Sequence, residues 1–344
     1  MDKIFIFGAG NLTRNKLQRV PNTFFRNVLL REVQGLIDND TQKTNTTLLG
    51  ISIFSPNILY TCDWNYVVVS SSYFQEIKEQ LLTELQIPED KIIDIDKYLR
   101  DRFIQYQYDK YMSQNKKSNY YYEKKFNCKS VVVYTAIRDG YDKLKEPKVI
   151  NNNFKYICFT NNNINSEVWE VINPKEYIDT EIETYWDKKL KIMPHKFFPE
   201  YDTSIWVDGS MQIIGEISEY MTMYQKYSDI LMMPHYEREC VYEEAAACIM
   251  QGKGQKKDII NQISYYCSES YPYDNGLVCG GFMVRNHNIG YVKKVMEDWW
   301  KQICIFSTRD QISFPYVLWK NQCVVDVSKE YCNDNDWIKV YAHK

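Results

Sequence analysis

Residues 204–211 constrain the possible fold of this chain more than any other stretch, because an apolar run there is followed by one carboxylate in a tight turn. The run at residues 205–207 predicts a buried strand with Asp208 at its end. Gly209 allows the chain to turn, and Ser210 offers a second oxygen. Hard divalent cations prefer oxygen ligands and neutralise a diphosphate leaving group, so the turn predicts a site for both. An ordinary Asp-Gly turn is the alternative.

Length and composition indicate a two-domain protein with two ordinary cores. A chain of 344 residues with 44% hydrophobic and 25% charged residues is typical of soluble globular proteins of that size. The net charge of −3 argues against nucleic acid as an obligate partner, because phosphate backbones normally require a basic surface. The ten cysteines lack C-x-x-C spacing, which favours reduced core thiols of a cytoplasmic protein over a zinc site or disulfides.

No segment of the sequence has the length of a membrane span. The first apolar run, at residues 4–7, ends at Gly8 and is too short for a signal sequence or a transmembrane helix. We therefore expect no transmembrane segment. Any contact with a membrane-bound acceptor would be peripheral and from the cytosolic side.

The N-terminal part has the pattern of a βαβ unit. A strand runs into the glycine turn at residues 8–10, and a helix and a second strand closed by Asp38 follow. Thr13 replaces the third glycine of a dinucleotide-binding turn, so both a working and a purely structural nucleotide fold stay open. Further strands at residues 66–69 and 92–95 predict a small doubly wound sheet.

The Phe-Gly-Ala-Gly and Ile-Asp-Asn-Asp segments of this module resemble the N-terminal modules of bacterial surface-polysaccharide enzymes, among them sugar acyltransferases. We place this Rossmann-like domain at residues 1–100. Residues 101–127 are polar and Tyr-rich without glycine or proline, and they predict a helical connector. The second domain then spans residues 128–344, where strands at 130–134, 156–159 and 205–207 alternate with helical stretches such as 178–193 and predict a second α/β sheet.

Six ordered segments of the second domain resemble the TOD/MUCI glycosyltransferase-like family. They are Val-Tyr-Thr-Ala, Tyr-Ile-Cys-Phe-Thr, Pro-His-Lys-Phe-Phe-Pro, Ser-Ile-Trp-Val-Asp-Gly-Ser, His-Tyr-Glu-Arg-Glu-Cys-Val-Tyr-Glu-Glu-Ala and Arg-Asp-Gln-Ile-Ser-Phe, starting at residues 133, 156, 194, 204, 235 and 309. The resemblance implies a GT-A-type fold similar to that of glycogenin-like transferases. It also implies transfer of a sugar from a nucleoside diphosphate donor, with uridine expected, to a glycan or lipid-linked acceptor in surface polysaccharide biosynthesis.

The resemblance also implies a set of site residues and a divalent cofactor, Mn²⁺ or Mg²⁺. The residues implied to bind the nucleotide are Tyr134, Thr135, Ala136, Arg138, Tyr141 and Asp208. The implied metal ligands are Asp208, Ser210 and His343, and the implied catalytic residues are Lys191, Asp310 and Gln311. The implied lining of the sugar or acceptor cleft is His235, Arg238, Glu243 and Arg309, and we expect the first three of these on one helix.

Several of these residues have structural alternatives. Tyr134 can be a core residue, Lys191 can lie on a solvated helix face, and Asp310 can serve as a helix cap. His235 and His287 compete with His343 as metal ligands, whereas His195 is more typical of a structural residue.

The sequence leaves two other functions open. Ser210 stands where many transferases of this fold carry a second carboxylate, which is compatible with a non-catalytic nucleotide-sugar-binding or scaffold protein. The first module alone would suit an NAD-dependent oxidoreductase, although it lacks the third glycine.

Overall fold

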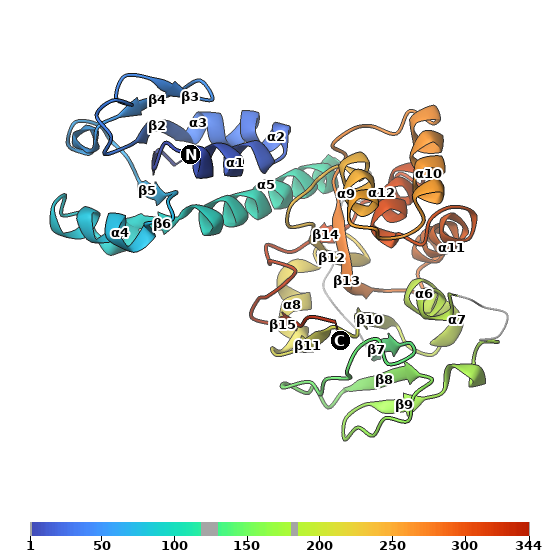
Figure 1. Ribbon diagram of the computed structural model, residues 1–344. Coiled ribbons are helices and arrows are strands. Elements are labelled where there is room, and N and C mark those ends of the chain that lie inside the picture. Colours follow the sequence, from blue (N-terminus) through green and yellow to red (C-terminus); the bar gives the residue numbers. More distant parts are fainter. Residues whose placement is uncertain (1, 118–129, 180–184, 344) are drawn as a thin grey trace. The chain divides into compact units, whose positions relative to one another are not determined.

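The computed structural model describes residues 2–117, 130–179 and 185–343 (Figure 1). The chain divides into two compact units, Met1–Tyr106 and Gln107–Lys344, and helix α5 (Ile95–Lys117) contributes residues to both. The connector predicted at 101–127 coincides with α5 over residues 101–117, and its remainder, like Cys128, lies outside the described residues.

The first unit contains a six-stranded sheet in the order β3-β4-β2-β1-β5-β6, in which only the β3–β4 pair is antiparallel. Its strands are β1 (Ile4–Phe7), β2 (Val33–Ile37), β3 (Thr47–Leu48), β4 (Ile51–Phe54), β5 (Tyr66–Val69) and β6 (Ile92–Asp94). Its helices besides α5 are α1 (Asn11–Arg19), α2 (Asn22–Phe24), α3 (Leu30–Glu32) and α4 (Phe74–Thr83). A π-helical turn, Phe25–Leu29, joins α2 to α3, and 3₁₀ turns occur at Pro56–Tyr60 and Glu89–Lys91.

Both faces of this sheet are buried, as expected for a doubly wound fold. Ile4 and Ile6 of β1 pack in one core with residues of α1, α2 and α5, while Phe5 and Phe7 point to the other core with Leu81 of α4. The alternation of successive side chains between the two faces of the strand produces these two cores.

The glycine turn of this unit is filled by its own side chains. Gly8 has φ +113°, and a Cβ there would lie 2.3 Å from the carbonyl oxygen of Ser70. Thr13 is fully buried, and its hydroxyl lies 2.9 Å from that of Ser70. The backbone N–H of Ala9 donates to the carboxylate of Asp38 at 3.0 Å, so the turn is closed by internal hydrogen bonds.

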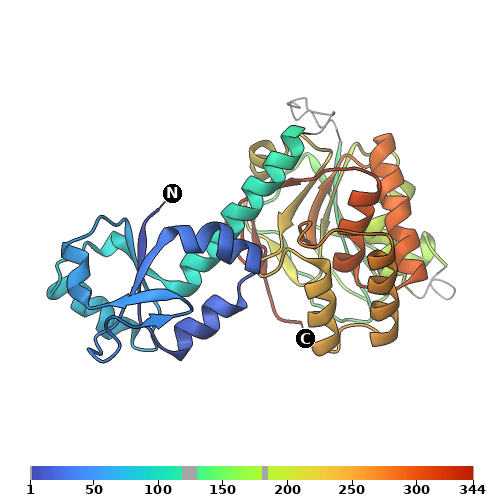
Figure 2. The ribbon, with the colours of Figure 1, turned by 90° about the horizontal axis from the view of Figure 1, so that it is seen from above.

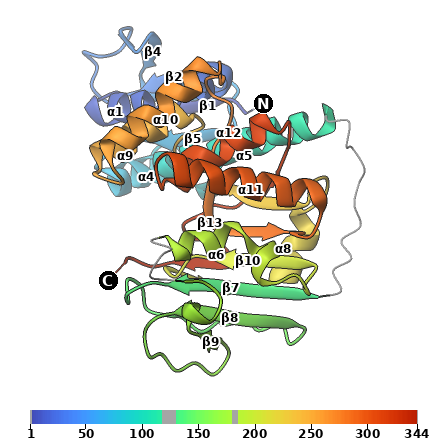
Figure 3. The ribbon, with the colours of Figure 1, turned by 90° about the vertical axis from the view of Figure 1, so that its right-hand side faces the viewer.

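The second unit contains a seven-stranded sheet in the order β14-β12-β13-β10-β7-β8-β9, in which β13 runs antiparallel to both of its neighbours and the other pairs are parallel. Figure 3 shows β7, β8 and β9 as neighbouring strands. The strands are β7 (Val131–Ile137), β8 (Phe154–Thr160), β9 (Glu170–Ile172), β10 (Thr203–Val207), β12 (Ile230–Pro234), β13 (Val278–Arg285) and β14 (Asp326–Val327). A separate antiparallel pair joins β11 (Met211–Ile213) to β15 (Ile338–Val340).

Helices cover the two faces of this sheet unequally. One face carries α6 (Trp186–Ile192), α7 (Pro194–Phe197), α9 (Val241–Met250), α10 (Lys256–Ser268), α11 (Gly290–Ile305) and α12 (Asp310–Lys320). The other face carries α8 (Ile217–Tyr224) together with the β11–β15 pair. Figure 2 shows α9 to α12, in orange and red, together on one side of the strands.

The strands of the second unit serve two cores by the same alternation. Val132 and Tyr134 of β7 face the core under α6 and α9 to α12, whereas Val131 and Val133 face the core under α8. The predicted α/β class, with a Rossmann-like unit followed by a GT-A-type unit, is confirmed by the two sheets.

Two helical predictions need correction. Within the predicted helix at residues 178–193, the described helix begins only at Trp186, and residues 180–184 lie outside the described part. His235 and Arg238 do not lie on a helix, because α9 starts at Val241 and the preceding residues form a turn after β12. In the described ranges, no helix combines the length and apolar character that crossing a membrane requires.

Candidate active site

A cleft of about 770 Å³ opens in the second unit where β7 and β10 end. Its lining comes from the loop after β7, helix α6, the turn after β10, the glycines of β13, the start of α12 and the C-terminal segment. The carboxyl ends of parallel strands are the usual binding edge of such sheets. The cleft therefore lies where the fold leaves backbone groups and loops available to a ligand.

Asp208 lies in the turn after β10, as predicted. Its backbone N–H donates to the carbonyl of Gly281 at 2.8 Å, which holds the turn against β13. One carboxylate oxygen, Oδ1, accepts from the indole of Trp206 at 2.5 Å and from Lys191 at 3.4 Å. The side chain remains 39% exposed and lines the cleft.

A pair of glycines in β13 makes room for the charged groups of the cleft. A Cβ at Gly281 would lie 3.2 Å from the Asp208 carboxylate, and a Cβ at Gly280 would lie 3.2 Å from Nζ of Lys191. Neither glycine was predicted from the sequence. Adjacent glycines inside a β-rich run are the signal that could have found them, because glycine in a strand often marks a close approach.

Lys191 forms the floor of the cleft rather than part of a solvated helix face. Its side chain is 4% exposed, and its ammonium lies 2.7 Å from Oδ2 of Asp310. Lys188 donates to the same oxygen at 3.1 Å, while Lys189 lies over the ring of Trp300. One face of α6 therefore directs two lysines into the cleft.

The charges of this cluster stabilise one another despite burial. Burial alone would lower the pKa of Lys191, but Asp208 and Asp310 raise it above its usual value. Burial alone would raise the pKa of Asp310, but Lys188, Lys191 and Arg309 hold it well below its usual range. Lys191 and Asp310 are accordingly both charged at neutral pH.

The start of α12 supplies three cleft residues, Arg309, Asp310 and Gln311. Asp310 also has a local structural role, since its Oδ1 accepts from the backbone N–H of Gln311 at 3.1 Å. Arg309 is partly buried, and its Nε lacks a hydrogen-bond acceptor among the described residues. Lys253, from the loop before α10, also lines the cleft and was not singled out from the sequence.

The loop after β7 and the C-terminal segment meet at the other side of the cleft. Ala136, Arg138 and Tyr141 line it as predicted, and Tyr141 is 63% exposed. The ring of His343 lies 4.7 Å from that of Tyr141. Nδ1 of His343 also lies 2.9 Å from the carboxylate of Asp142, a cleft residue that was not predicted from the sequence.

Tyr134 and Thr135 do not line the cleft, which corrects their predicted place beside the nucleotide. Tyr134 is fully buried, accepts a hydrogen bond from Arg285 at 2.6 Å and donates one to the carbonyl of Lys191 at 3.1 Å. Because side chains alternate along β7, Tyr134 points under α6, and the core alternative describes it correctly.

His235, Arg238 and Glu243 are not brought into the cleft either. His235 is 2% exposed, and its Nδ1 accepts the backbone N–H groups of Glu237 and Arg238, which shapes the turn after β12. Arg238 donates to Glu244 at 2.7 Å. These contacts account for His235 and Arg238 without a ligand, and Glu243 lies in the first turn of α9.

The competing histidines are core residues. His287 is fully buried and lies 2.9 Å from the carbonyl of Phe198, and His195 is also buried. Burial lowers the pKa of His195 and of His287 to about 4, so both are neutral at pH 7.

The side chains of the cleft can coordinate a divalent cation only if a bound phosphate group supplies further oxygen atoms. In residues 2–117, 130–179 and 185–343, no group of three or more His, Cys, Asp or Glu side chains is arranged to hold a metal. Asp208, Ser210 and His343 nevertheless line the same cleft and offer oxygen and nitrogen donors. Such a set suits a cation that completes its shell with phosphate oxygens.

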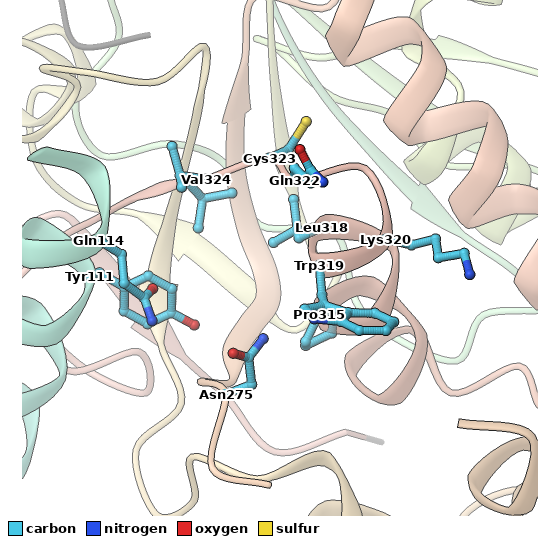
Figure 4. A pocket seen from close by; sticks show the side chains of 11 residues that line it. Tyr111, Gln114, Asn275, Pro315, Leu318, Trp319, Lys320, Gln322, Cys323 and Val324 are labelled. Atoms are coloured by element: carbon cyan, nitrogen blue, oxygen red, sulfur yellow. The ribbon is translucent and has the colours of Figure 1, made fainter. Parts of the chain in front are cut away.

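A second cavity of about 580 Å³ lies between α5 and the C-terminal end of α12. Figure 4 shows Trp319 and Pro315 on one side and Tyr111 and Gln114 on the other. None of the residues predicted for the site lines this cavity.

Two family models match different parts of the chain. Residues 107–343 match the family described as TOD1/MUCI70, glycosyltransferase-like domain, and residues 1–93 match the family described as C2185-like, N-terminal. The chain is 24% identical over 222 residues to a protein from Arabidopsis thaliana named "Probable hexosyltransferase MUCI70", and the match covers 55% of this chain. It spans only 37% of that relative's length.

Three similar solved structures superpose on the chain with low TM-scores. The UDP-D-quinovosamine 4-dehydrogenase of Vibrio fischeri is 27% identical, with 27% of this chain and 77% of that chain covered and a TM-score of 0.20. The bifunctional glycosyltransferase WbbM is 8% identical, with 60% and 40% covered and a TM-score of 0.36. Mouse xyloside xylosyltransferase 1 is 10% identical, with 95% and 84% covered and a TM-score of 0.27. Since the family match covers more than half of the sequence, this chain belongs to the TOD1/MUCI70 glycosyltransferase-like family.

Proposed function

We propose that the protein is a glycosyltransferase that moves a sugar from a nucleoside diphosphate donor, with uridine diphosphate expected, to a glycan or lipid-linked acceptor in surface polysaccharide biosynthesis. The observation that carries the proposal is the cluster of Lys191, Asp208 and Asp310 in one cleft at the binding edge of the sheet. Membership of the glycosyltransferase-like family supports it.

The donor nucleotide binds on the side of the cleft formed by the loop after β7. Tyr141 presents an exposed ring on which a base can stack, and Arg138 lies beside it. The diphosphate then lies against Asp208 and the turn after β10. This orientation directs the sugar toward Asp310 and Gln311 at the start of α12.

Charge in the cleft supports departure of the nucleoside diphosphate. Lys191 and Lys188 direct fixed positive charge at the position where negative charge develops as the sugar–phosphate bond breaks. A divalent cation such as Mn²⁺ or Mg²⁺ would be held by Asp208 and His343 and would supply a Lewis acid to the diphosphate. Asp310, held in place by two lysines, orients the sugar or the acceptor hydroxyl.

The proposal places the reaction in the cytoplasm, with at most peripheral contact to a membrane. The cysteine pattern of the sequence and the absence of a spanning helix in the described ranges are compatible with this location. Fractionation of cells that express a tagged chain tests it, and accumulation outside the cytoplasm would contradict it.

Calorimetric titration of the purified protein with nucleoside diphosphates and their sugars, with and without Mn²⁺, tests the donor site. We expect uridine diphosphate to bind with metal and to lose at least about tenfold in affinity in Asp208→Ala, because the variant removes a ligand of the bound cation. Asp202→Ala is the matched control, since Asp202 is exposed just before β10 and lies outside the cleft. Full affinity in Asp208→Ala would refute this site.

A non-catalytic nucleotide-sugar-binding protein is the second candidate. It is favoured by Ser210, which offers a hydroxyl where a second carboxylate would strengthen the metal site. Release of free sugar or its transfer to any acceptor, lost in Asp208→Ala, would exclude this candidate. Tight donor binding without turnover across a broad acceptor panel would favour it.

A further inference from the structure

The C-terminal segment is tied to the turn that carries Asp208. β15 pairs with β11, the strand that follows this turn directly. Beyond β15, the backbone N–H of Tyr341 donates to the carbonyl of Ser210 at 2.9 Å, and its hydroxyl donates to Gln212 at 2.7 Å. The last described residue, His343, is thereby brought into the cleft from a point 135 positions after Asp208 in the numbering.

Asp142 lies between the same turn and His343. It is 9% exposed, and a Cβ at Gly209 would lie 3.1 Å from its carboxylate oxygen Oδ2. Its other oxygen, Oδ1, lies 2.9 Å from Nδ1 of His343. Glycine at position 209 therefore leaves room for a carboxylate that reaches the histidine.

The pairing selects one form of the imidazole. An ionised carboxylate only accepts hydrogen bonds, so Nδ1 of His343 must carry the hydrogen. In the neutral ring, Nε2 then has a free lone pair, and no hydrogen bond from Nε2 to a described residue is found. Contact with the ring of Tyr141, at 4.7 Å, fixes the ring from a second side.

We propose that Asp142 is the positioning residue that holds His343 in the Nδ1–H form, so that Nε2 faces the cleft as a ligand for the donor-bound cation. A carboxylate behind a metal-binding histidine orients the ring and raises its basicity. The inference rests on the proposed function, because the cation arrives with the nucleoside diphosphate. The inference gives a role to Asp142, which lies outside the turn that carries Asp208.

A direct-ligand role for Asp142 makes a different prediction from the positioning role. If Asp142 bound the cation itself, in place of the carboxylate missing at Ser210, its charge would be essential. If it positions His343, a neutral acceptor at the same place is sufficient, because an Asn side chain can still accept from Nδ1–H. The variants Asp142→Asn and Asp142→Ala separate these roles.

The tautomer of His343 is measured first, in the metal-free protein, by ¹⁵N correlation spectroscopy of the imidazole rings. The chain contains only four histidines, so His343→Gln identifies the signal. We expect the Nδ1–H form in the native chain and in Asp142→Asn, and a shift toward Nε2–H in Asp142→Ala. An Nε2–H form in the native chain would overturn the inference whether or not the protein binds a nucleotide.

Mn²⁺ affinity in the presence of uridine diphosphate is measured next, by paramagnetic resonance of the free ion. We expect Asp142→Ala and His343→Ala each to weaken binding about 10- to 100-fold, which is the usual effect of a lost ligand support. The double variant should be no weaker than His343→Ala, because the two residues act as one unit. Asp142→Asn should retain most of the affinity.

The outcomes separate the inference from the function on which it rests. Asp334→Ala, an exposed carboxylate of the same C-terminal segment that lies outside the cleft, should bind Mn²⁺ like the native chain. Equal losses in Asp142→Asn and Asp142→Ala, or additive losses in the double variant, would overturn the positioning role. Absence of Mn²⁺ binding in the native chain, with the Nδ1–H form intact, would refute the proposed donor site instead.

Discussion

Lys191 and Asp310 form a buried ion pair in which the ammonium lies 2.7 Å from Oδ2 of the carboxylate. The two residues come from α6 and α12, separated by 119 positions, and only the fold brings them together. The same ammonium reaches Asp208 at 3.4 Å, so one cation connects the turn after β10 with the start of α12.

Replacing Lys191 by Met should destabilise the protein by about 3–5 kcal/mol, because it leaves the buried carboxylate of Asp310 with less compensating charge. Chemical denaturation measures this change, and calorimetry should show weaker nucleotide binding as well. Lys189→Met, on the same helix but over Trp300, is the control and should cost less than about 1 kcal/mol. If Lys189→Met and Lys191→Met cost the same, the ion pair does not stabilise the fold.

Replacing Tyr134 by Phe should destabilise the fold by about 1–3 kcal/mol and leave the affinity for nucleotides unchanged. The hydroxyl accepts from the fully buried Arg285, and its loss leaves that guanidinium group partly unsatisfied. Thermal unfolding and nucleotide titration together check this prediction. A large loss of affinity at native stability would instead restore the predicted role of Tyr134 beside the base.

Acid should destabilise the protein between about pH 6.5 and pH 4. Burial lowers the pKa of His195, His235 and His287 from 6.5 to about 4. In this interval the unfolded chain binds protons that the folded chain does not, so the stabilisation present above pH 6.5 is lost as the pH falls. Each histidine contributes up to about 1.4 kcal/mol per pH unit to the slope of the unfolding free energy against pH.

His235→Asn isolates one part of this slope. Asn can accept the backbone N–H groups of Glu237 and Arg238 that Nδ1 of His235 accepts, yet it does not titrate. The free energy of unfolding of the variant, measured from pH 7 to pH 4, should fall less steeply than that of the native chain. Parallel curves would show that His235 is not held neutral by the fold.

Replacing Thr13 by Gly should not create a dinucleotide site, although it completes the G-x-G-x-x-G pattern. The carboxylate of Asp38 still accepts from Ala9 at 3.0 Å and from Lys43 at 2.9 Å, which engages the groups that a dinucleotide would need. The variant should also be less stable to unfolding by about 1–3 kcal/mol, because it removes the buried hydrogen bond between the hydroxyls of Thr13 and Ser70. Binding of NAD at micromolar concentration would contradict this prediction and revive the oxidoreductase alternative.

Much of the fold could be predicted from local patterns. Apolar runs such as residues 205–207 predict strands, and the glycine turn at residues 8–10 predicts where a strand ends. Both signals depend only on a few neighbouring residues. Boundaries were less predictable. The helix expected from residue 178 is described only from Trp186, and the turn at His235 depends on hydrogen bonds that its sequence does not reveal.

The candidate site divides in the same way. Asp208 was found from its place in a turn after an apolar run, and the family resemblance added Lys191 and Asp310. Asp142, Gly280 and Lys253 were missed, because their roles arise from contacts between segments that are far apart in the chain. Tyr134 was assigned to the wrong face, since residue type alone does not determine the side of a strand that packs under helices.

The sequence by itself determined two α/β units, the family and the carboxylate turn at Asp208, because these depend on local periodicity and on ordered short segments. The tertiary structure alone decided that Lys191 is buried against Asp310, and that a C-terminal histidine reaches Asp142. These pairings depend on strand order and on the antiparallel contact between β11 and β15. Such long-range contacts are set by the packing of the whole unit, which no short stretch of residues encodes.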